Sequence, residues 1–275
     1  MDKLEFVKAV ASGNDFIILN TINGPKFGAR EQISRLAKEL CRRRLSVGAD
    51  GLLLIEPSAQ ADFKMRVFNP DGQEVTMCGN GARCVALFAS QKKIVKNDRM
   101  FIETGAGNLQ AEVKKDKVKL KMSPPKDLRL DFPLPLDSGI QKANYINTGV
   151  PHVVCFVPGL ENFPVGPAGK NIRYHPEFQP EGTNANFVQF IGKQRIKIRT
   201  YERGVEEETL ACGTGAVAAS IVTMFQELKP QGRHTVKVET RSGETLVVYF
   251  TVAGQEIKDV FLEGSAKIVY KALLN

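Results

Sequence analysis

Met77-Cys78-Gly79-Asn80-Gly81-Ala82 and Ala211-Cys212-Gly213-Thr214-Gly215-Ala216 are two versions of one short phrase, one in each half of a chain of 275 residues. Each has a cysteine before a Gly-x-Gly turn. The runs that follow, residues 83–90 and 217–226, are small and apolar on most sides, which is typical of a helix buried all round. We therefore expect each half to wrap a sheet around one central helix, with its cysteine at the mouth of that helix.

The rest of the chain repeats in the same order, and such self-similarity predicts two related units. The matching segments are residues 12–14 and 148–150, 48–51 and 182–185, 66–69 and 199–202, and 102–104 and 238–240. We predict an α+β fold of two pseudo-symmetric domains, each with a mainly antiparallel sheet, and an active site in the cleft between them. The first domain comprises residues 1–122 with a returning C-terminal strand, 264–275, and the second comprises residues 123–263.

Short runs rich in Val, Ile, Phe and Tyr, bounded by turn residues, predict most of the strands. They are residues 16–19, 51–55, 63–68, 118–122, 152–157, 187–191, 196–201, 236–240 and 246–251. A helix is expected over residues 31–44, and a short helical turn near Ile172. The Pro-rich stretch 123–135 is predicted to be a linker.

Composition is that of an ordinary globular protein, with 43% hydrophobic and 25% charged residues. The N-terminus shows no signal peptide and no apolar run is long enough for a membrane span. Five cysteines without framework spacing indicate a reducing compartment, so we expect a cytoplasmic protein with no membrane partner. The net charge of +8 comes without any nucleic-acid motif, so no nucleic-acid partner is expected.

Cys78 and Cys212 are the strongest candidates for chemistry. A thiol at a helix start loses its proton more easily, and the free N–H groups there also bind anions. Two such thiols suit a racemase without cofactor or metal, in which a thiolate removes a proton from one face of a carbon and a thiol protonates the other. The spacing of Cys78 and Cys84 does not fit a metal site.

The repeat also selects polar residues for the site. Asn69 and Glu202 occupy matching places about ten positions before their cysteines, and His152 aligns near Phe16. Asn14, Asn69 and Asn184 lie beside turn residues, which alone explains an asparagine, but their matched recurrence favours ligand contact. The Arg203 guanidinium is suited to a carboxylate, because its planar fork can bind both oxygens.

These residues together resemble the diaminopimelate epimerase family over nearly the whole chain. The resemblance rests on Gly13-Asn14-Asp15-Phe16, Phe68-Asn69-Pro70-Asp71-Gly72, Gly182-Thr183-Asn184-Ala185, Tyr201-Glu202-Arg203-Gly204 and the two cysteine phrases. It implies interconversion of LL- and meso-diaminopimelate, for lysine and peptidoglycan synthesis, without pyridoxal phosphate or metal. It also implies a small amino-acid substrate and, often, a homodimer.

Carried over by position, the resemblance assigns acid/base catalysis to Cys78 and Cys212 and thiol tuning to His152 and Glu202. It assigns substrate binding to Asn14, Asn69, Gly79, Asn80, Asn184, Glu202, Arg203, Gly213 and Thr214. Two places depart from the family pattern: Val150 stands where an Asn is usual, and Val10 near a usual His. Because valine cannot replace the hydrogen bonds of that Asn, we expect a relaxed or altered substrate pocket.

Three other interpretations stay open from the sequence. A related cofactor-independent racemase with a broader substrate range would use the same thiols, and Val150 keeps that alternative open. A redox protein that joins Cys78 and Cys212 in a reversible disulfide is separated from a racemase by α-deuterium incorporation from D₂O. A basic nucleic-acid-binding module would require salt-dependent duplex binding.

Overall fold

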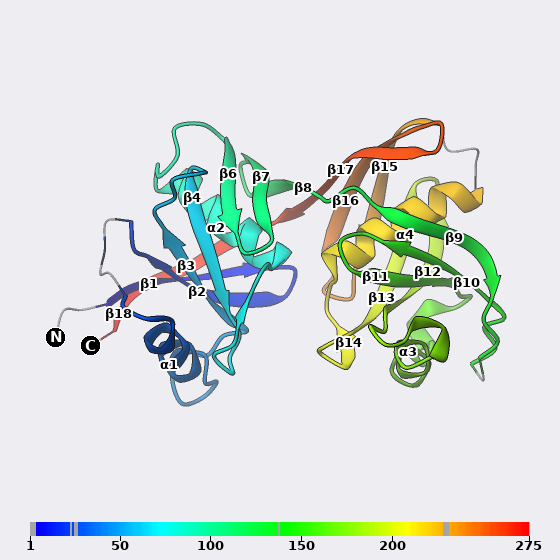
Figure 1. The fold of residues 1–275 in the computed structure, drawn as a ribbon, viewed down its shortest axis with the longest axis horizontal. Coiled ribbons are helices and arrows are strands. Elements are labelled where there is room, and N and C mark those ends of the chain that lie inside the picture. Colours follow the sequence, from blue (N-terminus) through cyan, green and yellow to red (C-terminus); the bar gives the residue numbers. More distant parts are fainter. Residues whose placement is uncertain (1–3, 23, 25–26, 137, 228–230, 275) are drawn as a thin grey trace. The chain divides into compact units, whose positions relative to one another are not determined.

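The computed structural model describes residues 4–22, 24, 27–136, 138–227 and 231–274. The chain divides into two units, which we call the first unit (residues 1–120 and 264–275) and the second unit (residues 121–263) (Figure 1).

The first unit is one mixed sheet with two helices. Its strands pair in the order β18–β1–β2–β3–β4–β6–β7–β8, and the short β5 also pairs with β4. Among the strands that the structure describes in this unit, β2–β3 and β4–β6 are the parallel pairs. The elements are β1 (Leu4–Ala11), β2 (Asn14–Asn20), α1 (Arg30–Leu40), β3 (Gly51–Glu56), β4 (Phe63–Phe68), β5 (Glu74–Val75), α2 (Gly79–Gln91), β6 (Arg99–Thr104), β7 (Gly107–Lys114), β8 (Lys117–Lys121) and β18 (Lys267–Leu274).

The second unit has the same plan. Its strands pair in the order β9–β10–β11–β12–β13–β15–β16–β17, β14 also pairs with β13, and the parallel pairs are β11–β12 and β13–β15. The elements are β9 (Lys126–Pro133), β10 (Lys142–Asn147), β11 (Pro151–Phe156), η1 (Leu160–Asn162), α3 (Val165–Arg173), η2 (Pro176–Phe178), β12 (Asn184–Gly192), β13 (Arg195–Glu202), β14 (Glu207–Thr209), α4 (Gly213–Glu227), β15 (Gly232–Glu239), β16 (Thr245–Ala253) and β17 (Glu256–Ser265).

The two units match element for element, which confirms the predicted α+β fold of two similar halves. β1 to β8 correspond to β10 to β17 in order, α1 corresponds to α3, and α2 to α4. The C-terminal β18, which pairs with β1, takes the place that β9 takes beside β10. The repeat therefore covers the whole sheet of each unit, including the C-terminal strand.

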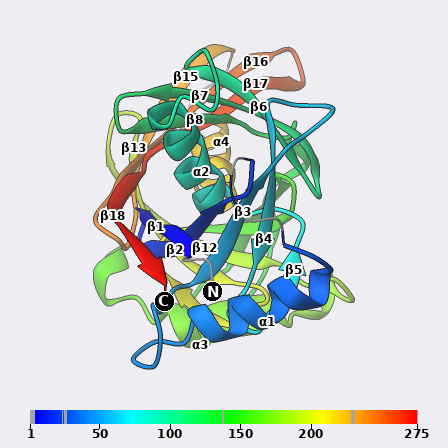
Figure 2. The same cartoon turned by 90° about the vertical axis from the view of Figure 1, so that its left-hand side faces the viewer.

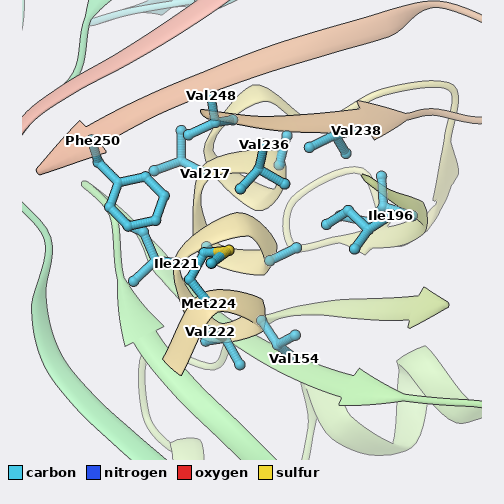
Figure 3. Close-up of a cluster of buried hydrophobic side chains, with 14 of the residues drawn as sticks. Val154, Ile196, Val217, Ile221, Val222, Met224, Val236, Val238, Val248 and Phe250 are labelled. Atoms are coloured by element: carbon cyan, nitrogen blue, oxygen red, sulfur yellow. The ribbon is translucent and has the colours of Figure 1, made fainter. Parts of the chain in front are cut away.

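The central helices are buried on nearly every side. Every side chain from Asn80 to Ala89 on α2 is buried. Around α4, the valines and isoleucines of the helix pack against strands β11, β13, β15 and β16, as Figure 3 shows for Val217, Ile221, Val236 and Val248. A helix that is apolar all round needs such a sheet around it, which is why the post-cysteine runs could be recognised in the sequence.

The outer helices cover the opposite face of each sheet. α1 buries Ile33, Ala37 and Leu40, one stripe at helical spacing, against Leu52 and Leu54 of β3. Leu53, between those two leucines, faces α2 instead, and Figure 2 shows β3 lying between the two helices. Among the described residues, the helices fall short of the length and hydropathy that a membrane crossing requires.

One expectation about local structure was wrong, and two gave a helix of the wrong length. The Pro-rich stretch 123–135 is not a linker, because residues 126–133 form β9, whose prolines lie outside the strand or at its last position. The helix expected over 31–44 ends at Leu40, and Arg43 beyond it turns back to two carboxylates. The turn near Ile172 is a nine-residue helix, α3.

Candidate active site

Cys78 caps the N-terminus of α2 in the first unit. Its backbone is extended (φ −143°, ψ 114°), and its sulfur accepts a hydrogen bond from the Gly81 N–H at 3.4 Å. The first N–H groups of a helix have no partner within it and lie at the positive end of its dipole. This position therefore favours negative charge on the Cys78 sulfur or on an anion beside it.

The side chain of Asn80 is already hydrogen-bonded within the first unit, so Asn80 can offer a ligand only its backbone N–H at this helix start. The Asn80 amide donates to Asn14 Oδ1 at 2.6 Å, and its oxygen accepts from the buried Arg83 guanidinium at 2.9 Å. At Gly79, by contrast, a Cβ atom would meet nothing within 4 Å. The space in front of the first turn is thus open at Gly79, where a ligand could approach the N–H groups.

Asn14 is held by a charged cluster beneath it. Its amide donates to Asp50 at 3.1 Å, and Arg43 bridges Asp50 and Asp15 with contacts of 2.6 Å. Burial raises the pKa of Asp15, but hydrogen bonds from Arg43 and Lys8 outweigh it and hold that pKa at about 2. Asp15 therefore stays ionised at neutral pH, and the cluster holds Asn14 against Asn80.

Asn69 lies half-buried where β4 ends. Its backbone closes the turn to β5, accepting from the Gly72 N–H at 2.8 Å and donating to the Gln73 carbonyl at 2.9 Å. The structure thus joins Asn14 and Asn80 directly, and places Asn69 at the turn that precedes the Cys78 phrase.

Cys212 precedes α4 in the second unit and is buried. Burial raises the pKa of its thiol well above the ordinary value, the nearby charge of Glu202 adds to this, and hydrogen bonds with Thr214 and the Gly215 N–H oppose it. The sulfur lies 3.5 Å from Thr214 Oγ1. In this environment Cys212 is a protonated thiol, placed between hydrogen-bond donors and a carboxylate.

Glu202 is the carboxylate that contacts the Cys212 thiol. The Thr209 hydroxyl also donates to it. Burial raises the pKa of Glu202, although the hydrogen bonds from Thr209 and Cys212 oppose this. Because the Glu202 carboxylate accepts from the thiol, it is the hydrogen-bond partner of Cys212 while the sulfur is protonated.

His152 contacts Thr214, which in turn contacts Cys212. Its Nε2 lies 2.9 Å from Thr214 Oγ1, and its Nδ1 lies 3.1 Å from the Asn186 amide nitrogen. Burial, with the charge of Arg203, lowers the pKa of His152 to about 3. The imidazole is therefore neutral at pH 7, and any influence on the thiol passes through hydrogen bonds instead of charge.

Arg203 lines a cavity of about 530 Å³, and Asn184 contacts its backbone. The Asn184 oxygen accepts from the Arg203 backbone N–H at 2.9 Å, and the guanidinium donates to the Glu181 carbonyl at 2.9 Å. Arg203 and Val150 both line the cavity. The residue that departs from the family pattern therefore lines the same cavity as the arginine expected to bind a carboxylate.

Sequence reasoning missed three polar residues of the second unit: Asn186, Thr200 and Thr209. The available signal was the alternation along β12, since Asn186 follows Asn184 by two positions and so lies on the same face of the strand. Within the described residues, no three His, Cys, Asp or Glu side chains come together as metal ligands.

Comparison with known proteins gives consistent matches. The sequence profile of the family described as "Diaminopimelate epimerase" matches residues 6–127 and 144–269. A diaminopimelate epimerase of Aquifex aeolicus is 42% identical and one of Chlorobaculum tepidum 39%; the alignments cover 99% and 96% of this chain and 98% of each relative.

Solved structures with much lower identity share the fold. A PhzF-family phenazine biosynthesis protein from Bacillus anthracis has a TM-score of 0.74 at 18% identity, with both chains fully covered. A hydroxyproline epimerase from Agrobacterium vitis has a TM-score of 0.70 at 16% identity, over 99% of this chain and 92% of its own.

Proposed function

Because this chain belongs to the diaminopimelate epimerase family and is an isomerase, we propose that Cys78 and Cys212 invert the α-carbon of diaminopimelate between its LL and meso forms. The observation that carries this proposal is the sulfur environment in each unit. Each cysteine precedes a buried helix, and the second glycine of each phrase, Gly81 or Gly215, gives its N–H to the sulfur.

The reaction moves one proton to a sulfur and one from a sulfur. A thiolate takes the α-proton, which breaks the Cα–H bond and forms an S–H bond. The other thiol gives its proton to the opposite face, so the α-carbon is inverted and the two sulfurs exchange protonation states. Cys212, whose pKa is raised by burial, is the proton donor in one direction, and Cys78 then acts as the thiolate.

The substrate carboxylate beside the reacting carbon is assigned to the two helix starts, at Gly79-Asn80 and Gly213-Thr214. Backbone N–H groups there stabilise the charge that develops as the α-carbon loses its proton. Asn14, Asn69, Asn184, Glu202 and Arg203 are assigned to the rest of the substrate. Arg203 is supported by its place at the cavity, and Asn14 by its bond to Asn80.

The test is initial-rate epimerisation of LL-diaminopimelate in D₂O under reducing conditions. If two different thiols act, early product carries solvent deuterium at the α-carbon while unreacted substrate stays unlabelled. Cys78→Ala and Cys212→Ala should each lower kcat at least about 1,000-fold, because each removes an acid/base group.

Matched controls come from the buried thiols away from the helix starts. Cys41 and Cys155 lie in the cores beside α1 and α3, where burial raises the pKa to about 11 and about 12. Cys41→Ala and Cys155→Ala should keep kcat within about threefold, since neither thiol is assigned to the reaction. Wild-type activity in either Cys78→Ala or Cys212→Ala would refute the two-thiol scheme.

We also propose that the protein works in the cytoplasm, as a homodimer. The support for a reducing compartment is that all five cysteines are free thiols. The dimer rests on family resemblance, and sedimentation equilibrium of the purified protein tests it. A monomer at every concentration would refute it.

A further inference from the structure

We propose that Asn186 is a positioning residue for Cys212, which sets the tautomer of His152 and thereby points the Thr214 hydroxyl hydrogen at the Cys212 sulfur. The inference rests on the proposed role of Cys212 in proton transfer. It adds Asn186, and behind it Thr200, to the residues on which the reaction depends.

The orientation of the Asn186 amide is determined by its neighbours. Its nitrogen lies 2.8 Å from the Val153 carbonyl, which can only accept, and its oxygen lies 3.1 Å from the Thr200 hydroxyl. Asn186 and Thr200 are both buried. With the nitrogen so placed, its second hydrogen is donated to Nδ1 of His152 at 3.1 Å.

A neutral imidazole carries one hydrogen, so a ring whose Nδ1 accepts must hold that hydrogen on Nε2. His152 is neutral because burial lowers its pKa to about 3. Its Nε2–H therefore donates to Thr214 Oγ1, 2.9 Å away. The single hydroxyl hydrogen of Thr214 is then directed to the Cys212 sulfur at 3.5 Å.

The Cys212 sulfur thus has partners for both of its protonation states. As a thiol it donates to Glu202, and as a thiolate it accepts from the Thr214 hydroxyl and the Gly215 N–H. Hydrogen bonds to a charged acceptor are worth more than those between neutral groups. The relay from Asn186 therefore stabilises the thiolate form of a sulfur that burial otherwise keeps protonated.

The first unit shows that the fold does not need this polar pair. Phe16 pairs with Gly51 between β2 and β3, as His152 pairs with Asn184 between β11 and β12. Two residues after Gly51 in β3 comes Leu53, and two residues after Asn184 in β12 comes Asn186. Leu53 lies against Gly81 and Asn186 against Gly215, the second glycine of each cysteine phrase.

Phenylalanine and leucine thus fill the same places in the first unit that histidine and asparagine fill in the second. Burying polar groups costs free energy even when they are paired, and apolar residues pack there without that cost. We infer that the His152–Asn186 pair is retained for Cys212 and not for packing.

Nitrogen NMR of histidine-labelled protein tests the tautomer without any substrate. The chain has only three histidines, so the His152 ring is assigned by its loss in His152→Phe. The wild type should show hydrogen on Nε2 and none on Nδ1. In Asn186→Asp a carboxylate replaces the donor, so Nδ1 should gain a hydrogen; an unchanged tautomer would overturn the proposal.

Kinetics test whether the three residues act as one relay. Asn186→Leu and Thr214→Val should each lower kcat for diaminopimelate about 10- to 100-fold. Thr214→Val removes a hydrogen bond to the charged sulfur, and Asn186→Leu, which installs the leucine of the first unit, removes the group that orients that hydrogen bond. KM should change less than about threefold, and Thr214→Ser should keep most of the activity. The Asn186→Leu/Thr214→Val double variant should be no slower than Thr214→Val alone, because the relay is already broken.

Thr223→Val is the matched control. Thr223 is buried on the same helix, and its hydroxyl has no hydrogen-bond partner in the described part of the chain, so this variant should keep wild-type kcat. Losses that multiply in the double variant would refute the relay, as would full activity of Thr214→Val. Asn186→Asp replaces Asn186→Leu in the cycle if the leucine variant does not fold. A wild-type protein inactive on diaminopimelate would defeat the proposed function, while the NMR result would still decide the tautomer.

Discussion

Gly215→Ala should damage the second unit far more than Gly81→Ala damages the first, although the two glycines occupy matching places. A Cβ at Gly215 would lie 2.4 Å from the Asn186 side-chain oxygen and 3.3 Å from the Cys212 sulfur. At Gly81 the nearest atom is a Leu53 methyl carbon at 3.0 Å. A leucine methyl moves by a small side-chain rotation, whereas the Asn186 amide is held by three hydrogen bonds.

The size of the effect follows from those contacts. Moving the amide far enough to clear the new methyl weakens its bonds to Thr200, Val153 and His152, at about 1 kcal/mol each. Replacing glycine by alanine within a helix returns up to about 1 kcal/mol. The net cost at Gly215 is therefore about 2–3 kcal/mol, while at Gly81 the Leu53 adjustment of about 1 kcal/mol is offset by the same gain.

Tyrosine fluorescence provides the assay, because the chain has no tryptophan and four of its five tyrosines (145, 174, 201 and 249) lie in the second unit. Thermal unfolding of Gly215→Ala should begin about 4–12 °C below the wild type, at about 2–4 °C per kcal/mol. Gly81→Ala, followed by circular dichroism, should unfold within about 3 °C of the wild type. Equal losses in the two variants would refute the argument, since it attributes the cost to the Asn186 amide and not to the turn itself.

Three further predictions concern charge and recognition. The folded-state pKa of Asp15, about 2, lies below its ordinary value of 3.8. The ionised carboxylate therefore stabilises the fold above about pH 4 by about 1 kcal/mol after solvent screening, and this stabilisation is lost as the pH falls toward about 2. In Asp15→Asn, the free energy of unfolding should depend less on pH between about 4 and about 2. Arg199→Lys should destabilise the second unit by about 1–3 kcal/mol in urea unfolding, because the guanidinium binds a carboxylate twice at 2.7 Å and three backbone carbonyls. Val150→Asn should lower KM for diaminopimelate about fivefold with kcat nearly unchanged, because it restores a hydrogen-bonding side chain in the cavity that Arg203 also lines.

Each of these predictions has an outcome that contradicts it. A pH dependence that survives in Asp15→Asn would show that other carboxylates carry the acid sensitivity. An Arg199→Lys protein as stable as the wild type would show that one ammonium group can replace the two-pronged guanidinium contact with Glu208. An unchanged KM in Val150→Asn would show that position 150 does not meet the substrate.

The repeat could be predicted because its matching segments consist of residues with strong local preferences for a turn, a buried helix or a strand. The Cys-Gly-x-Gly phrases and the apolar runs behind them predicted buried helices, and the apolar and aromatic residues of 63–68 predicted a strand with the observed bounds. Strands β7, β9 and β17 were missed, since much of their length is exposed and carries polar or charged side chains. Pairing with a neighbouring strand, and not local preference, makes them strands.

The site was only partly predictable for a related reason. Cys78, Cys212, His152 and Glu202 stand out by type and by their matched places. Asn186 does not, because alternation with Asn184 places it on the same face of β12 but only the folded sheet shows that it lies against the second glycine of the phrase in α4. The tautomer of a histidine likewise depends on partners that come from distant parts of the chain.

The pairing of β1 with β18 sets an order of events during synthesis. Residues 4–10 meet residues 267–274 along this ladder, so the sheet around α2 stays incomplete until the ribosome has released residue 274. The second unit, residues 121–263, is complete before then. The first unit, which begins to be synthesised first, is therefore completed last. Until β18 pairs with β1, the nascent chain exposes the unpaired edge of β1, to which chaperones that hold unfolded chains would bind.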